Sequence, residues 1–380
     1  MKPIVLLGAT GSIGRQTRDV AARQGWEIVG LAARSASDEL LVAANEFPEA
    51  VVVVADPLDN GRSHFETVLG DRVQFGDDAV EDLASRRGVV VVNGIVGAVG
   101  LQASVAALEA GNRLALANKE TLVAGGPVVL EAARRGGGEI VPIDSEHSAL
   151  WQCLVGERRS DVRRLILTAS GGPFRSRTRS ELENVTVAEA LNHPTWSMGP
   201  RITIDSATLA NKALEVIEAH YLFNVPYDAI DVVVHPESIV HSMVEYADGA
   251  IIAELGAPDM RLPIQYALAY PERAFVPPDP FDFTAQPLTF HEPDTDTFRC
   301  LALGYAAGRI GGSATAVLNA ADEVAVAAFL EQRIGFLEIA DVIDAALETV
   351  EHGPVTTIAD VVAYDHEARR VAGEWIAGRG

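Results

Sequence analysis

The sequence predicts an α/β protein that begins with a doubly wound parallel sheet, continues into an α+β region and ends in a helical region. In the first 150 residues, short β-branched runs alternate with helical patterns, which is typical of βαβ units. Two alternating apolar runs then meet at Asp248-Gly249, a strong hairpin signal. From about Phe298 onward, apolar residues recur at helical spacing. At 380 residues the chain is also longer than one typical domain.

The parallel sheet is predicted from six short apolar runs in the first 150 residues. They are Ile4–Leu7, Ile28–Ala32, Val51–Ala55, Val89–Val92, Leu114–Ala117 and Glu139–Ile143. Between most of these runs lie stretches with apolar residues at helical spacing, such as Arg15–Gln24, Asp38–Phe47 and Leu101–Ala110. We therefore place the first domain at residues 1–150.

The remaining residues divide into an α+β part, a linker and a helical part. We interpret Arg164–Thr168 and Ile230–Val234 as strands, Ala207–Phe223 as a helix, and Ile239–Tyr246 with Ala250–Leu255 as an antiparallel hairpin. Pro277, Pro278, Pro280 and Pro287 mark a linker. The predicted boundaries are 151–275 for a catalytic and dimerisation domain, 276–297 for the linker and 298–380 for the helical domain.

Composition excludes several classes of partner. The formal net charge of −23 would repel nucleic acid and anionic membrane surfaces, so a small molecule in a locally positive pocket is the expected ligand. The most apolar stretch, residues 89–101, is interrupted by Asn93 and by glycines and cannot span a bilayer. Cys153 and Cys300 form no disulfide framework, and Ile4–Leu7 is too short for a signal-peptide core. We expect a cytoplasmic protein.

A glycine-rich loop follows the first predicted strand. Gly8, Gly11 and Gly14 stand between that strand and the first helix. Glycines there allow a tight turn, close approach of the backbone to a pyrophosphate, and packing of the helix on the strand. This placement favours a Rossmann-type, dinucleotide-binding domain over the alternative of a tight turn without a ligand.

The end of the second strand favours NADPH over NADH. NAD-preferring folds usually place an acid there to bind the ribose 2′-hydroxyl. This chain instead has Arg34 and Ser35, which suit a 2′-phosphate. The alternative is that Arg34 is an ordinary solvated loop residue.

Two carboxylates follow the last strand of the parallel sheet. If the extended conformation persists, Asp144 and Glu146 point the same way, because side chains alternate along a strand. Their mutual repulsion would be relieved by a hard divalent cation, Mg²⁺ or Mn²⁺. The alternative is a surface carboxylate pair at a helix start. We interpret the neighbouring His147 as structural.

A third ligand is proposed on a helix introduced by Asp205-Ser206. On this helix Asn211, Lys212 and Glu215 share one face by their spacing of three and four residues. We propose Glu215 as the third metal ligand. An ordinary Glu–Lys helix pair is the alternative.

Four further polar segments have unusual composition. Residues 170–175 (Ser-Gly-Gly-Pro-Phe-Arg) could arrange backbone N–H groups around an anion. Residues 193–200 (His-Pro-Thr-Trp-Ser-Met-Gly-Pro) suit a mobile lid, or else a surface loop capped by Trp196. In Asn118-Lys119-Glu120 the outer residues could reach a cofactor ribose and Lys119 a substrate hydroxyl, or the segment could be a solvated face. His235-Pro236-Glu237-Ser238 is assigned a structural or interface role.

Taken together, these segments resemble the 1-deoxy-D-xylulose 5-phosphate (DXP) reductoisomerase family. The matching stretches run in the same order from Gly8 to about Leu330, which is nearly the whole chain. They read GATGSIG, ANKE, IDSEHSA, SGGPFR, HPTWSMG, IDSATLANKALE, HPES, LPIQYAL and NAADEVAVAAFL. The middle motifs are the most specific. One departure is Arg34, where the family commonly has glycine.

The resemblance implies a V-shaped homodimer with NADPH, catalytic and helical domains, and it assigns roles by position. Asp144, Glu146 and Glu215 would hold the metal, while Ser145 and Lys119 approach the substrate backbone. The residues matched to substrate phosphate and lid are Ser170, Ser206, Asn211, Lys212, His193 and Trp196. Those matched to the cofactor are Thr10, Gly11, Ser12, Ile13, Asn118, Glu120 and Gly199. Lys119, Glu146 and His193 are the expected catalytic residues.

The implied reaction rearranges a sugar phosphate and then reduces it. The metal would act as a Lewis acid on the chelating ketose, carbon–carbon cleavage and re-formation would give a branched aldehyde, and NADPH would deliver hydride to yield 2-C-methyl-D-erythritol 4-phosphate. One alternative, a semialdehyde-dehydrogenase-like enzyme, needs a cysteine nucleophile, which neither Cys153 nor Cys300 is placed to supply. A dinucleotide-sensing protein without catalysis is the other alternative.

Overall fold

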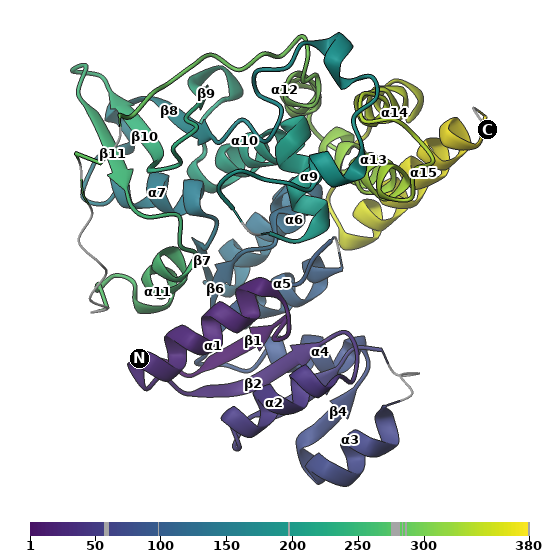
Figure 1. Ribbon diagram of the computed structural model, residues 1–380. Coiled ribbons are helices and arrows are strands. Elements are labelled where there is room, and N and C mark those ends of the chain that lie inside the picture. The colour runs from purple at the N-terminus through teal and green to yellow at the C-terminus, as the bar shows by residue number, and fades with distance from the viewer. Residues whose placement is uncertain are drawn as a thin grey trace. The chain divides into compact units, whose positions relative to one another are not determined.

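The computed structural model describes residues 1–56, 61–97, 99–196, 198–274, 282, 284–285 and 287–378. Their contacts divide the chain into two compact units (Figure 1). The first unit comprises Met1–Thr121, Val128–Ser148 and the described residues from Asp259 to Ala274. The second comprises Leu122–Pro127, Ala149–Pro258 and the described residues from Asp282 onward. The four-part division expected from the sequence is finer than this one and stays a prediction.

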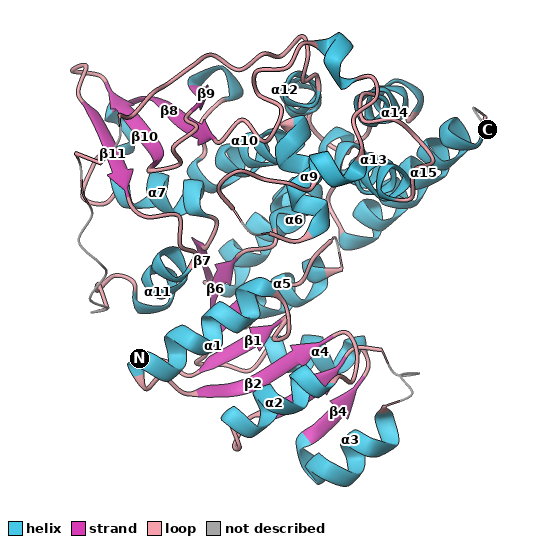
Figure 2. Ribbon diagram, viewed as in Figure 1, coloured by secondary structure: helices cyan, strands magenta, loops and turns pink. Residues whose placement is uncertain are grey.

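The first unit contains a seven-stranded parallel sheet in the order β4-β3-β2-β1-β5-β6-β7. Figure 2 shows strands of this sheet, among them β1, β2 and β4, in magenta. The chain reverses its direction of travel across the sheet between β1 and β5, so their carboxyl ends form the switch point where ligands bind in such folds. The strands are β1 (Ile4–Leu7), β2 (Ile28–Ala33), β3 (Val51–Val54), β4 (Val73–Phe75), β5 (Val90–Asn93), β6 (Arg113–Leu116) and β7 (Glu139–Pro142).

Helices follow most of these strands and pack on the sheet. Helix α1 packs against α11, and α4 packs against α5. The helices are α1 (Ser12–Gln24), α2 (Asp38–Glu46), α3 (Arg62–Leu69), α4 (Asp77–Ala84), α5 (Gly100–Glu109) and α11 (Arg261–Ala269). Helices α6 (Lys119–Gly136) and α7 (Ser145–Cys153) each have residues in both units. Helix α6 is kinked at Gly125, and Pro127 explains the break because it has no N–H to donate.

The predicted doubly wound fold is confirmed, and the six expected strands are all present. Strand β4 was not expected. It is an edge strand of three residues, Val73-Gln74-Phe75, none of them buried, so it leaves no apolar run in the sequence.

The second unit combines a mixed sheet with a helical layer. The sheet has the order β11-β10-β8-β9, in which β10 is antiparallel to both β8 and β11 while β8 and β9 are parallel. The strands are β8 (Val162–Ala169), β9 (Ile230–Val234), β10 (Val240–Tyr246) and β11 (Ile251–Leu255). The helices are α8 (Val187–Ala190), α9 (Pro200–Thr208), α10 (Ala210–Phe223), α12 (Cys300–Ile310), α13 (Ala314–Leu330), α14 (Glu338–Thr349) and α15 (Ile358–Ala377). The hairpin and the helical C-terminal region are therefore confirmed.

The single helix predicted over Ala207–Phe223 is wrong in its first part. Helix α9 ends at Thr208 and α10 begins at Ala210, because Leu209 between them adopts a left-handed conformation with φ 61°. A leucine at positive φ is strained, and it is held there by burial of its side chain in the core of the unit. Nothing local in the sequence marks this break.

Three of the linker prolines, at positions 277, 278 and 280, lie outside the described residues. Within the part of the chain that is described, no helix combines the length and apolarity needed to cross a membrane.

Candidate active site

The glycine loop has the geometry that its spacing predicts. Gly8 follows β1 with φ 83°, and a Cβ there would lie 2.6 Å from the Gly94 carbonyl oxygen. A Cβ on Gly14 would lie 2.3 Å from the Gly8 carbonyl oxygen, so only glycine lets α1 pack this closely on the loop. Gly11 precedes α1 in an extended conformation, and no side chain caps that helix. The N–H groups of the first turn, from Ser12 on, thus face the switch point without an internal side-chain acceptor.

Arg34 and Ser35 are exposed directly after β2, as the 2′-phosphate hypothesis requires. The next carboxylates, Asp38 and Glu39, belong to the first turn of α2, and Glu39 forms an ion pair of 2.8 Å with Arg15. Neither acidic residue directly follows β2, although Asp56 after β3 donates its backbone N–H to the Arg34 carbonyl oxygen at 2.9 Å. Binding of a 2′-phosphate by Arg34 and Ser35 stays a prediction.

Asn118 and Glu120 are buried and bind the backbone of their own unit. Asn118 caps α6 by accepting the Thr121 N–H at 2.8 Å, and its Nδ2 donates to the carbonyls of Ile95 at 2.8 Å and Gly97 at 2.9 Å. Glu120 accepts the Gly97 N–H at 3.2 Å. These bonds hold the loop that follows β5 at the switch point. The predicted contacts with a cofactor ribose stay predictions.

Asp144 and Glu146 are close together, but not for the reason expected. The alternation argument is wrong, because β7 ends at Pro142 and Glu146 lies in the first turn of α7. Asp144 accepts the N–H groups of Glu146 and His147, each at 3.2 Å, as an N-cap residue does. A carboxylate oxygen of Asp144 and one of Glu146 lie within 4.8 Å of each other. The Ser145 hydroxyl donates to Glu146 at 2.6 Å.

Two cationic or polar groups oppose the charge of Asp144. The Lys119 ammonium forms an ion pair with Asp144 Oδ2, and Nδ1 of the fully buried His147 lies 3.2 Å from Asp144 Oδ1. Burial alone would raise the pKa of Asp144, but Lys119 and then His147 outweigh it and hold the pKa well below its usual range. The carboxylate is therefore ionised at neutral pH. His147 supports this pair, in line with its structural interpretation.

Helix α10 in the second unit presents the predicted polar face. Asn211 Nδ2 donates to Glu215 Oε1 at 2.5 Å, and the Lys212 ammonium forms an ion pair with Glu215 Oε2. Side chains of Lys212 and Glu215 are only 4% and 1% exposed, which excludes an ordinary solvated Glu–Lys pair. A buried carboxylate and a buried ammonium side by side are typical of a site for a charged ligand.

The loop at Ser170 packs directly on α9. Gly172 has φ 65°, and a Cβ there would lie 2.9 Å from both the Ser206 carbonyl oxygen and Ala207 Cα. This close approach brings the Ser170 loop to the α9 turn that carries Ser206. Asp205 and Ser206 do not introduce the helix of Glu215, as had been expected; they lie inside α9, which precedes it.

His193 connects the lid segment to Ser170. Its Nδ1 accepts the backbone N–H groups of Thr195 at 3.1 Å and Trp196 at 2.9 Å, so Nδ1 carries no proton. Nε2–H therefore donates to the Ser170 hydroxyl oxygen at 2.9 Å, and the Gly172 N–H donates to the same oxygen at 3.2 Å. With its oxygen accepting twice, the Ser170 hydroxyl has its hydrogen available for an anionic ligand.

The lid segment is only partly described, since Ser197 lies outside the described residues. Trp196 is half-buried, and its ring centroid lies 6.3 Å from that of His241 on β10. The pKa of His193 is lowered, first by burial and then by the charge of Arg175. Both effects favour the neutral ring that the hydrogen bonds require.

The pH dependence of folding stability is expected to reflect the neutral ring of His193. Because the pKa of His193 in the folded protein lies below its ordinary value of 6.5, its contribution is present above pH 6.5 and is lost as pH falls through the folded pKa. His193→Asn keeps an acceptor for the two backbone N–H groups but does not titrate. Thermal melting at stepped pH should show wild type losing stability relative to this variant below pH 6.5. Parallel curves would contradict the assignment, since the other histidines are common to both proteins.

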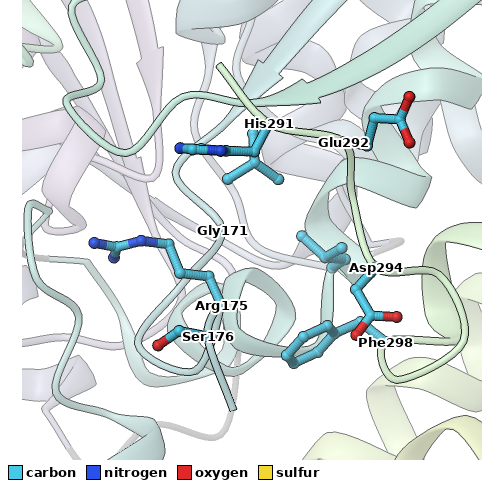
Figure 3. Close-up of a pocket in the computed structure, with 9 residues that line it drawn as sticks. Gly171, Arg175, Ser176, His291, Glu292, Asp294 and Phe298 are labelled. Carbon is cyan, nitrogen blue, oxygen red and sulfur yellow. The ribbon is translucent and has the colours of Figure 1, made fainter. Parts of the chain in front are cut away.

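A pocket of about 220 Å³ opens beside the Ser170 loop, and sequence reasoning did not foresee it. Figure 3 shows Arg175 and Ser176 on one side of it and Glu292 and Asp294 on the other. Segments far apart in the sequence form this pocket, so no local pattern could have indicated it. Its lining residues are Gly171, Arg175, Ser176, Leu209, Val234, His291, Glu292, Asp294 and Phe298.

Neither cysteine is suited to act as a nucleophile. Cys153 is buried at the end of α7, and burial raises the pKa of its thiol to about 12. Cys300 is buried at the start of α12, and burial raises the pKa of its thiol still further. A thiol protonated at neutral pH is a poor nucleophile, which agrees with rejection of the semialdehyde-dehydrogenase hypothesis.

Comparison with known proteins gives consistent results over the whole chain. Family models match at residues 4–126 (1-deoxy-D-xylulose 5-phosphate reductoisomerase), 140–223 (its C-terminal domain) and 255–371 (DXP reductoisomerase C-terminal domain). The 1-deoxy-D-xylulose 5-phosphate reductoisomerase of Caldanaerobacter subterraneus subsp. tengcongensis is 48% identical over 373 residues, covering 97% of this chain and 98% of that protein. That of Desulforamulus reducens is 49% identical, covering 99% of each chain.

Solved structures agree with the sequence relatives. The Zymomonas mobilis enzyme in complex with NADPH has a TM-score of 0.91 at 40% identity and covers 99% of each chain. A DOX-P reductoisomerase in complex with NADPH, fosmidomycin and magnesium has a TM-score of 0.93 at 39% identity, covering 99% of this chain and 98% of that one. The chain therefore belongs to the 1-deoxy-D-xylulose 5-phosphate reductoisomerase family.

Proposed function

We propose that this protein converts 1-deoxy-D-xylulose 5-phosphate into 2-C-methyl-D-erythritol 4-phosphate by rearrangement followed by reduction with NADPH, in the non-mevalonate route to isoprenoid precursors. The observation that carries the proposal is the α10 face, where Lys212 and Glu215 form an ion pair and are both buried. A cation for phosphate and a carboxylate for metal on one helical face suit a substrate that bears a phosphate and chelating oxygens.

The proposed metal ligands are Asp144, Glu146 and Glu215. Their carboxylates are the hard oxygen ligands that Mg²⁺ and Mn²⁺ prefer, and the DOX-P reductoisomerase complex contains magnesium. Asp144 and Glu215 each contact a lysine ammonium, so each carboxylate is already placed beside a positive charge. When bound, the metal would supply Lewis-acid polarisation of the ketose carbonyl.

The substrate phosphate is assigned to Ser170, Ser206, Asn211 and Lys212. Ser170 offers the hydroxyl hydrogen that His193 and Gly172 leave available. Lys212 supplies a full positive charge from a buried position. Closure of the segment carrying His193 and Trp196 over the substrate would exclude water and keep the carbon fragments together during rearrangement.

Lys119 and Ser145 are assigned to the substrate backbone. Both already lie beside a metal-ligand carboxylate, Lys119 against Asp144 and Ser145 against Glu146. From there the Lys119 ammonium would stabilise negative charge that develops on a substrate oxygen. Glu146 is placed to accept or return a proton through the Ser145 hydroxyl, to which it is hydrogen-bonded at 2.6 Å.

Apart from Gly199, the residues assigned to NADPH belong to the first unit, around its switch point. The cofactor's pyrophosphate would meet the first turn of α1, its 2′-phosphate would meet the residues after β2, and its nicotinamide ribose would meet the start of α6. The assigned residues are Thr10, Gly11, Ser12, Ile13, Arg34, Ser35, Asn118, Glu120 and Gly199.

Turnover provides the test. Purified protein with DXP, NADPH and Mn²⁺ should lose absorbance at the nicotinamide band, and the loss should stop when a chelator removes the metal. NADPH binding without any metal-dependent oxidation would favour the dinucleotide-sensing alternative. The product should be identified as 2-C-methyl-D-erythritol 4-phosphate, because oxidation alone does not demonstrate the rearrangement.

Gly172→Ala tests the assigned phosphate site. At Gly172 a side chain is disfavoured both by the positive φ and by the close contact with Ser206. Gly156 is the control, because it also has a positive φ, 85°, but a Cβ added there would meet no described atom within 4 Å. Gly156→Ala should therefore lose only about 1–2 kcal/mol of stability and keep its KM. Gly172→Ala should lose more than its control and raise KM for DXP, as measured by thermal melting and steady-state kinetics. Equal effects of the two substitutions would argue against a phosphate site at this contact.

We also propose that the protein is a cytoplasmic homodimer. Strand β11 lies at the edge of the mixed sheet, and Ile251 and Ile252 on it are 53% and 39% exposed. An exposed apolar edge strand is a ready surface for a second copy. Sedimentation equilibrium at micromolar concentration should give twice the chain mass of 40.4 kDa, and a monomer would exclude the dimer.

A further inference from the structure

We propose that Arg201 is a positioning residue that fixes the first turn of α9 to α13 and thereby sets the placement of Ser206. This inference rests on the proposed function only in assigning Ser206 to the substrate phosphate. Helix α9 begins directly after Gly199 and carries Ser206 in its last turn. Any shift of α9 would therefore move Ser206, which is assigned to the substrate phosphate.

Arg201 contacts carboxylates from two different helices. Its guanidinium lies 3.7 Å from Asp205 on α9, and from α13 it lies 3.6 Å from Asp322 and 3.2 Å from Glu323. Asp205 and Asp322 have side chains only 5% and 1% exposed. Because isolated buried carboxylates are costly, a cation between them strongly favours one arrangement of the two helices. Figure 1 shows α9 beside α13 in the second unit.

The position of Arg201 is unfavourable for the helix that carries it. It is the second residue of α9, and the positive end of the helix dipole disfavours a cation in the first turn. No acidic residue in that turn offsets it. The stabilisation of an arginine here must therefore come from outside the turn, and the α13 carboxylates provide it.

Glu323 is held from its other side by the C-terminal helix. Arg369 on α15 forms ion pairs with Glu323 and, at 2.6 Å, with Asp365. Asn319 Nδ2 also donates to Glu323 at 3.3 Å. Glu323, which pairs with Arg201, therefore also has partners on α13 and α15. The apolar residues Ile204 and Ala207 bury the other face of α9 but lie beyond its first turn.

The test compares two charge-balanced double variants. Arg201→Met with Asp322→Asn removes the link to α9 together with one buried charge, so that the remaining site is not left with an extra carboxylate. Arg369→Met with Asp365→Asn removes one charge of each sign in the neighbouring network but leaves Glu323 with Arg201 and Asn319, so that the link between α9 and α13 is kept. Circular dichroism should give the wild-type spectrum for both and reports that each protein is folded.

Only the Arg201 double variant should raise KM for DXP, about tenfold, with kcat within about threefold of wild type. In the protein without ligands, hydrogen exchange in residues 200–208 should accelerate in that variant and not in the Arg369 variant. The exchange measurement is independent of turnover, so it tests the inference even if DXP is not the substrate. If the Arg201 double variant does not fold, Arg201→Lys, which keeps the charge and loses the planar fork, should show the same two changes. Unchanged KM and exchange, or equal changes in the Arg369 variant, would overturn the proposal.

Discussion

Glu215→Gln should reduce kcat by about 10³-fold or more while leaving the affinity for NADPH nearly unchanged. Glutamine preserves the shape of the side chain but removes the charge that would hold the metal, and a lost metal contact is worth several kcal/mol in the transition state. Glu215 belongs to the second unit, whereas the glycine loop and β2 belong to the first. Cofactor binding should therefore survive, as fluorescence titration with NADPH would measure.

Glu218→Gln is the matched control for this substitution. Glu218 is also buried on α10, one turn later, but it is not assigned to metal or substrate. Mn²⁺ binding followed by magnetic resonance should weaken in Glu215→Gln and not in Glu218→Gln. Loss of NADPH binding in Glu215→Gln would show that Glu215 is wrongly assigned to the metal alone. An equal loss of kcat in Glu218→Gln would show that burial of a carboxylate on this helix, rather than metal binding, is what matters.

Gly14→Ala should destabilise the first unit enough to abolish NADPH binding. The added Cβ would lie 2.3 Å from the Gly8 carbonyl oxygen and 2.6 Å from the Ala9 carbonyl carbon, both backbone atoms that cannot move without displacing α1 from the sheet. Overpacking of this kind costs about 1–3 kcal/mol or more. The readouts are thermal melting and NADPH titration.

Substitutions at two other glycines distinguish an effect on folding from an effect on NADPH binding. At Gly11 a Cβ would meet its nearest atom at 3.4 Å with an ordinary backbone conformation, so Gly11→Ala should melt like wild type yet bind NADPH more weakly. At Gly373, in α15, a Cβ would have no described atom within 4 Å, and Gly373→Ala should change neither binding nor folding for the worse. A Gly14→Ala protein with wild-type melting and NADPH affinity would refute the packing argument.

Much of the fold could be predicted because its signals are local. The β-branched runs, the glycine spacing and the Asp248-Gly249 turn each depend on a few neighbouring residues, and each is found where it was expected. The polar face of α10 could be predicted for the same reason, since three- and four-residue spacing is sufficient to place Asn211 and Glu215 together.

Other features of the site could not be predicted in this way. The start of α7 replaces the extended strand that was expected at Glu146, because Asp144 caps a helix there. The break between α9 and α10 depends on burial of Leu209, which has a strained backbone conformation. The pocket beside the Ser170 loop is formed by segments more than a hundred residues apart in the sequence. Each of these outcomes is set by contacts that a local pattern does not contain.

By itself, the sequence determined most of the strands and helices, the glycine loop and the polar face of α10, because these follow from backbone preferences and short-range spacing. Two features were decided only by the tertiary structure. The backbone at Gly172 packs closely against the backbone at Ser206, and Arg201 lies among the carboxylates of α9 and α13. The physical reason is that close packing and the pairing of buried charges depend on which distant segments meet, and that is resolved only when the whole core is formed.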